Sequence, residues 1–133
     1  MLYIAVVLRL TVFRFGVSFE QRQINLIPFV DLAEVFTGAV LWAFLRLFLG
    51  NIGWFVPFGF LLPVLMKNPS FLKIVLSGFV FSFGIEVAQY FSRQGVAELD
   101  DLLLNTLGVM IGYFGFKIFV GKNGLQPRIT GVQ

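Results

Sequence analysis

The chain has 133 residues and a net charge of +3; 58% of its residues are hydrophobic and only 13% are charged. A soluble domain carries roughly 25% charged residues, so this composition excludes an ordinary water-soluble domain and predicts a lipid environment. The sequence contains no cysteine and no histidine, which excludes thiolate chemistry, histidine triads and histidine-based zinc or haem sites. We therefore expect no metal and no cofactor. We also expect no nucleic-acid partner, because the lysines and arginines are scattered singly between apolar runs.

Apolar stretches of the length that crosses a bilayer, about 17–25 residues, follow one another along the chain. They predict an all-α, polytopic membrane helix bundle of about four transmembrane helices. The bundle forms one domain over residues 1–121, and a flexible tail follows over 122–133. A further helix at the membrane interface is predicted within 31–48, where charged residues interrupt the apolar pattern. The predicted spans are residues 2–19, 50–66, 71–91 and 102–120.

Single residues mark local features of these spans. Pro57 lies inside the second span and should kink it, because proline cannot donate a hydrogen bond to the carbonyl of Gly53. Ser70 stands where it can cap the third span. The fourth span carries Gly108-x-x-x-Gly112, whose missing side chains predict close packing against another helix.

The basic residues predict the orientation of the bundle. If the spans alternate, the side that holds both termini carries Lys67, Lys73, Lys117, Lys122 and Arg128, and the opposite side carries Arg22, Arg46 and Arg93. Loops on the cytoplasmic side of a membrane are enriched in lysine and arginine. The asymmetry therefore predicts that both termini are cytoplasmic and that the loop over 92–101 is external.

Polar residues inside the predicted spans indicate a site. Glu86 lies about 7–8 Å below the outer end of the third span, where a carboxylate needs a partner or a wet cavity. Gln89 shares its helix face, and Asp101 and Asn105 form a stripe at matching depth. The depths predict one outward-opening ligand site made of Arg14, Asn51, Glu86, Gln89, Asp101 and Asn105. The structural alternative is that Arg14 neutralises Glu86 and that Asn105 makes an interhelical hydrogen bond.

Ordered motifs give the chain a family resemblance. They are Asn25-Leu-Ile-Pro-Phe29, Asn51 with Phe55-Val-Pro-Phe-Gly59, Glu86-x-x-Gln89, and Asp100-Asp101-x-x-x-Asn105-Thr-Leu-Gly108 with Gly112. In this order and spacing they resemble the VanZ-like membrane proteins, from about Arg22 to Tyr113. Two positions depart from the family pattern: Glu98 stands where an aspartate is usual, and Arg93 stands near Gly95, where the family commonly has an arginine.

The resemblance implies a small, multi-span protein of the bacterial cell envelope. The name-giving member of the family is associated with low-level resistance to the glycopeptide teicoplanin. Our leading interpretation is a non-enzymatic protein that binds an amphiphilic molecule, either a lipid-linked precursor or a lipoglycopeptide, at an outward-facing polar cleft. One alternative is an intramembrane enzyme on a lipid-linked cell-wall substrate, with Glu86 or Asp101 as general acid or base. Another is a structural membrane subunit without a ligand.

Overall fold

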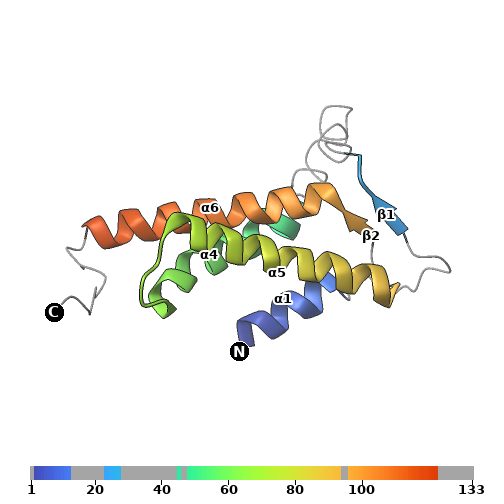
Figure 1. The fold of residues 1–133 in the computed structure, drawn as a ribbon, viewed down its shortest axis with the longest axis horizontal. Coiled ribbons are helices and arrows are strands. Elements are labelled where there is room, and N and C mark those ends of the chain that lie inside the picture. The colour runs from blue at the N-terminus through green and yellow to red at the C-terminus, as the bar shows by residue number, and fades with distance from the viewer. Residues whose placement is uncertain (1, 13–22, 28–44, 46–47, 94–95, 123–133) are drawn as a thin grey trace.

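The computed structural model describes residues 2–12, 23–27, 45, 48–93 and 96–122, and these are mostly helical (Figure 1). In chain order the elements are α1 (Leu2–Val12), β1 (Gln23–Asn25), the π-helix η1 (Phe48–Ile52), α4 (Gly53–Leu65), α5 (Phe71–Ser92), β2 (Val96–Glu98) and α6 (Leu99–Lys122). Arg14, most of the predicted interfacial helix and the tail beyond Lys122 lie outside the described residues.

Local signals at both ends define α5. Ser70 has an extended backbone, and its Oγ accepts a hydrogen bond from the Lys73 N–H at 3.4 Å, which confirms the predicted cap. At the other end Arg93 adopts the left-handed conformation (φ 57°) and donates its N–H to the Gln89 carbonyl at 3.1 Å. This residue closes the helix in the manner usually left to glycine.

The start of α6 differs from the sequence prediction. The stretch over 92–101 was expected to be a polar loop, but α6 begins at Leu99 and so includes Asp100 and Asp101 in its first turn. Acidic side chains look like loop residues in an apolar sequence, yet they are favourable near a helix N-terminus, where the helix dipole is positive. The helix therefore extends three residues further than hydropathy indicates.

A short strand pair is the second difference from the all-α prediction. Residues Gln23–Asn25 of β1 pair in parallel with Val96–Glu98 of β2, with Ile24 opposite Ala97. The pair lies at the end of the bundle where α5 ends and α6 begins (Figure 1). After the strand, the Asn25 side chain accepts a hydrogen bond from the Ile27 N–H at 3.2 Å, a local turn that competes with further strand pairing.

Glycines set the distance between α4 and α6. A Cβ atom at Gly112 would collide with the Val56 carbonyl, and one at Gly108 would collide with the Ile52 carbonyl. On the facing helix, a Cβ at Gly59 would collide with the backbone of Val109. The two helices thus approach backbone to backbone, as small residues allow in membrane proteins. Pro57 lies inside α4, between Val56 and Gly59 in the sequence.

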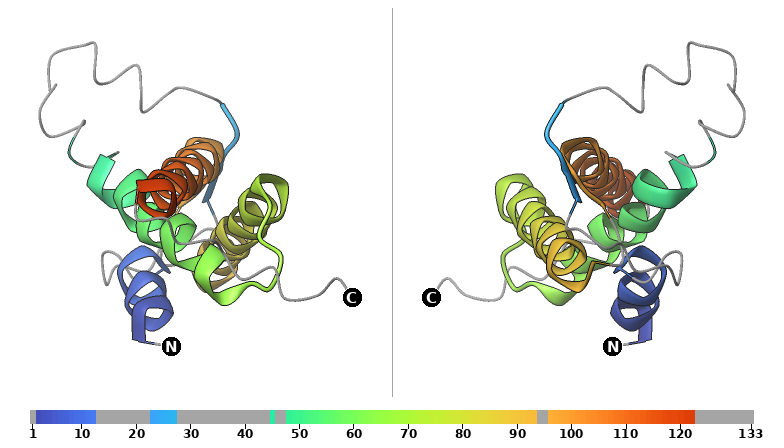
Figure 2. Two further views of the ribbon diagram at one scale, coloured as in Figure 1. Left: turned by 90° about the vertical axis from the view of Figure 1, so that its left-hand side faces the viewer. Right: turned by 90° about the vertical axis from the view of Figure 1, so that its right-hand side faces the viewer.

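The remaining helices pack around this pair. Seen end on, α4 and α5 flank α6, and α1 lies on the side away from α6 (Figure 2). The Tyr3 hydroxyl of α1 donates a hydrogen bond to the Trp54 carbonyl of α4. Val7 of α1 is fully buried, and the apolar core that it joins also contains Phe55, Ile74, Ile85, Val109 and Tyr113.

The outward faces of α5 and α6 are apolar. Leu72 is 72% exposed and Ile118 is 60% exposed, and such residues recur along both helices. Water would penalise a patch of this extent, whereas lipid does not. Among the described residues, α5 and α6 are the helices long and apolar enough to cross a membrane, and the apolar stretch Leu49–Leu65 is shorter. The exposed apolar faces and these two helices favour a membrane location, and the count of about four spans stays a prediction.

Candidate functional site

Polar side chains are buried between the helices at the end of the bundle that holds the strand pair. On α5 they lie at i, i+4 and i+7, so they follow one helix face. On α6, Asp101 and Asn105 lie at i and i+4 on one face, and Asp100 lies beside them in the first turn. Each of these side chains is at most 7% exposed; they are Asn51, Ser82, Glu86, Gln89, Asp100, Asp101 and Asn105. A polar interior inside an apolar exterior is the arrangement expected of a membrane bundle.

Glu86 connects α5 to the strand pair. Its Oε2 accepts a hydrogen bond from the backbone N–H of Glu98, the last residue of β2, at 2.9 Å. The side chain is 7% exposed, so this charge-assisted bond offsets part of the cost of desolvating a carboxylate. The position of β2, and of its partner β1, is thereby fixed relative to α5.

Asp101 makes a separate polar pair with the second predicted span. Its Oδ1 accepts a hydrogen bond from Nδ2 of Asn51, and both side chains are buried. Asn51 lies in the π-helix η1, where one extra residue in the turn changes the direction of the side chains; such turns are frequent at functional sites. The carboxylate also lies in the first turn of α6, where the helix dipole favours negative charge.

Asn105 faces Ser82, a residue that sequence reasoning missed. Nδ2 of Asn105 donates to Oγ of Ser82 at 2.9 Å, in the bundle interior. Asn105 was expected at the level of Glu86, but Ser82 lies one helical turn further from the Ser92 end of α5. The signal that could have identified Ser82 is its i−4 spacing from Glu86. Within the described part of the chain, Oδ1 of Asn105 has no hydrogen-bond partner.

The other predicted site residues are placed as follows. Gln89 is 4% exposed and lies on the Glu86 face of α5. Arg14, the predicted counter-charge, lies outside the described residues. Where the chain is described, there is no group of three or more acidic side chains that could hold a metal ion.

A groove of about 250 Å³ runs along α5 beside the strand pair. Its lining is nearly all apolar and comes from both strands, from α5 and from the start of α6: Ile24, Leu26, Phe83, Glu86, Val87, Tyr90, Phe91, Ala97, Glu98, Leu99 and Leu102. Of the predicted ligand residues, Glu86 belongs to this lining. Asn51, Gln89, Asp101 and Asn105 do not. The structure thus divides the predicted cluster into a groove with a buried carboxylate and a set of polar residues inside the bundle.

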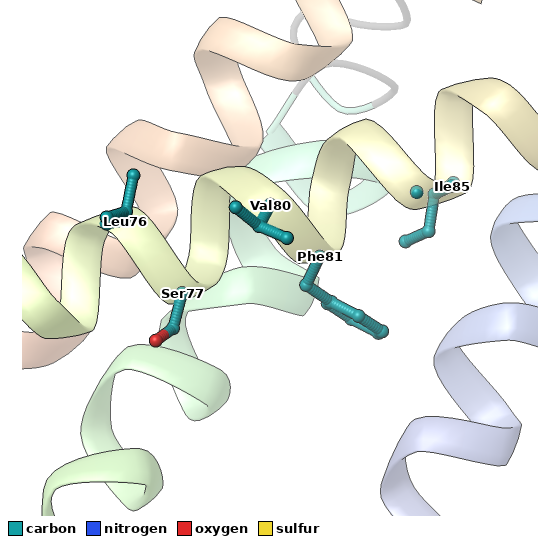
Figure 3. Close-up of a pocket in the computed structure, with 6 residues that line it drawn as sticks. Leu76, Ser77, Val80, Phe81 and Ile85 are labelled. Atoms are coloured by element: carbon teal, nitrogen blue, oxygen red, sulfur yellow. The ribbon is translucent and has the colours of Figure 1, made fainter.

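A second hollow, of about 660 Å³, lies on another face of α5 (Figure 3). Its described lining comes from α5 alone, and the Phe81 ring points towards the space between α4 and α1. Neither strand contributes to it, and no predicted site residue lines it. The groove beside the strands is therefore the better candidate site.

The sequence of this chain is similar to one family of known proteins. The family model described as VanZ/LLP1 matches residues 1–120. Protein VanZ of Enterococcus faecium is 29% identical over 102 residues, which make up 77% of this chain and 55% of that protein. The chain thus spans about half the length of this curated relative. No solved structure matches the chain.

Proposed function

The chain belongs to the VanZ/LLP1 family, and from this we propose that it binds an amphiphilic molecule in the bacterial cell envelope and contributes to resistance against glycopeptides such as teicoplanin. The amphiphile is a lipoglycopeptide or a lipid-linked cell-wall precursor. The observation that carries the proposal is the groove, which combines an apolar lining with a buried carboxylate at the polar end of the bundle.

An amphiphile needs two kinds of surface, and both occur here. The side chains of Phe83, Val87 and Phe91 offer an apolar wall that is partly exposed. At the same end of the bundle, the Glu98 N–H and the Glu86 carboxylate form a polar link between α5 and β2. A tail can lie in the groove while the head group stays beside the strand pair, where the polar residues gather.

The alternatives account for less of the structure. An acid–base enzyme needs a proton-transfer group within hydrogen-bond reach of its substrate, but Asp101 is engaged by Asn51 inside the bundle and does not line the groove. A purely structural role fits the Asn51–Asp101 and Ser82–Asn105 pairs. It gives no reason for an open apolar groove beside a buried carboxylate.

The charges favour an outward-facing groove. Four exposed lysines lie at or near the start of α5 or the end of α6: Lys67, Lys73, Lys117 and Lys122. These two helix ends lie at the same end of the bundle (Figure 1). The buried acids lie towards the other end, beside the strands. By the positive-inside rule, the lysine end faces the cytoplasm together with both termini, and the strand pair and the groove face outward.

Binding of teicoplanin to the protein in phosphatidylcholine nanodiscs tests the proposal. Val87 is 38% exposed at the rim of the groove, so Val87→Trp should fill the groove without burying new bulk in the core. We expect this variant to lower teicoplanin affinity by about tenfold, equivalent to about 1.4 kcal/mol. Phe79→Trp, on an exposed position of the same helix outside the groove, is the control and should bind like the parent.

A glycopeptide without an acyl chain completes the comparison. It should bind the parent and Val87→Trp equally weakly, because it has no tail to place in the groove. If Val87→Trp binds teicoplanin as tightly as the parent does, the groove is not the binding site.

A further inference from the structure

The groove has a definite length. Its lining on α5 runs from Phe91, near the end of the helix, to Phe83. The eight steps from Phe83 to Phe91, at 1.5 Å each, give this lining a length of about 12 Å. On α6 the lining is confined to Leu99 and Leu102, in the first turn. The groove therefore begins at the strand end of the bundle and stops part of the way along the helices.

This length suits a hydrocarbon chain that is shorter than the lipid tails of a bilayer. An extended polypeptide advances 3.3–3.6 Å over three backbone bonds, which is about 1.2 Å per bond. We take the same advance per bond for an extended acyl chain. About 12 Å then holds roughly ten bonds. One leaflet contributes about 15 Å of hydrocarbon, so a phospholipid tail is longer than the groove.

The volume indicates how many chains fit. Pockets for drug-sized ligands enclose about 300–1,000 Å³, and this groove encloses about 250 Å³. This volume lies below that range, and the elongated lining along α5 suits one acyl chain better than a pair of tails. Ala97, which belongs to the lining, is 7% exposed and has a small side chain that takes up little of this space.

Selection in a membrane rests on fit. A chain that leaves lipid for an apolar groove gains little from the hydrophobic effect, since lipid tails are equally apolar. The remaining contribution to the binding free energy is packing, because dispersion contacts form only where atoms of the acyl chain touch atoms of the groove. A chain that ends where the groove ends makes all of these contacts, whereas a longer one must bend or protrude past Phe83.

We propose that the groove binds one acyl chain of roughly ten bonds, and that the Phe83 ring at its inner end sets the chain length. The inference rests on the proposed function and names the part of the amphiphile that this site selects: a single medium-length tail. It disfavours a long-chain lipid-linked precursor, and the phospholipids of the bilayer, as the preferred occupant.

Photo-crosslinking with a homologous series of N-acylglucamides tests the inference. The probes carry a diazirine at the terminal carbon, and their chains lengthen from about eight to about sixteen carbons, around the roughly ten-bond groove. With the protein in phosphatidylcholine nanodiscs, labelling is normalised to the probe present in the membrane and located by mass spectrometry. We expect a maximum near ten carbons, a severalfold decline by sixteen, and labels near Phe83 and Leu102.

Two matched variants identify the end of the groove. Phe83→Ala should move the maximum to chains about four bonds longer, since removing the ring opens about one more helical turn. Phe79→Ala, the same change one turn further along α5, should leave the maximum in place. Because Phe83 is 54% exposed and Phe79 is 40% exposed, neither change removes a core contact.

The outcomes separate the two proposals. Equal groove labelling at every chain length, or a Phe83→Ala profile identical to that of the parent, overturns the length selection but leaves amphiphile binding standing. Groove labelling that is absent for every probe overturns both. A maximum that moves in Phe83→Ala and not in Phe79→Ala supports the inference.

Discussion

The side chain of Asn51 donates a hydrogen bond to the carboxylate of Asp101 across fifty positions of the sequence. The bond joins the π-helix at the start of the second apolar stretch to the first turn of α6. Because both side chains are buried, neither can exchange this bond for one with bulk water. The pair therefore anchors the polar end of the bundle, beside which the groove lies.

Removing the donor of this pair should destabilise the protein. We expect Asn51→Ala to cost about 1.5–3 kcal/mol, the range for hydrogen bonds to charged groups, and to lower the melting temperature in detergent by several degrees. Thr106→Ala is the control, because the Thr106 hydroxyl donates to the Leu102 carbonyl of its own helix and so joins no second element among the described residues. Equal melting temperatures for the two variants would show that the Asn51–Asp101 bond contributes little.

Glycines that look alike in the sequence should respond in opposite ways to alanine. Gly112→Ala drives a Cβ into the Val56 carbonyl and should cost about 1–3 kcal/mol through overpacking. Gly84→Ala meets nothing within 4 Å and should be neutral or stabilising, by up to about 1 kcal/mol. Thermal unfolding in detergent measures both. If Gly112→Ala has the same melting temperature as the parent, α4 and α6 do not pack as closely as described.

Much of this arrangement could be read from the sequence. The motifs indicated the family, which the VanZ/LLP1 match confirms. Apolar length and the Ser70 signal indicated α5 almost to the residue. These features depend on local patterns, and local patterns are what a single sequence contains.

The parts that could not be predicted depend on distant partners. Strands β1 and β2 have three residues each and pair across more than seventy positions, so neither offers enough residues for a period-2 pattern. The π-helix at Asn51 has no composition signal. The groove needs the strand pair for one wall, and so Glu86 is the one residue of its lining that the sequence predicts as a ligand residue. The sequence also does not show which neighbouring helix each predicted polar residue contacts, because that depends on how the helices pack.

The Glu86→Gln variant removes the negative charge of this side chain and keeps its shape. The amide oxygen can still accept from the Glu98 N–H, and only the extra strength of a charge-assisted bond is lost. We expect the melting temperature to stay within a few degrees of the parent while teicoplanin binding in nanodiscs weakens. A stable variant with unchanged binding would leave Glu86 with a positioning role for β2 alone.

The orientation can be tested with single cysteines, because the natural chain has none. We predict that an impermeant thiol reagent applied to intact cells labels Arg93→Cys, beside the strand pair. It should not label Lys67→Cys, at the opposite end of the bundle, until the cells are opened. Both positions are exposed, so accessibility on the protein surface is matched. The reverse pattern would place the groove on the cytoplasmic side.

The inhibitory concentration of teicoplanin for a susceptible host tests the central claim most directly. The host produces the parent, Val87→Trp or Phe79→Trp, and membrane levels of the three are matched by immunoblot. If a tail bound in the groove underlies resistance, the parent and Phe79→Trp should raise the inhibitory concentration, and Val87→Trp should return it to that of the empty host. A Val87→Trp protein that is present at parental level and protects as well as the parent would contradict the account.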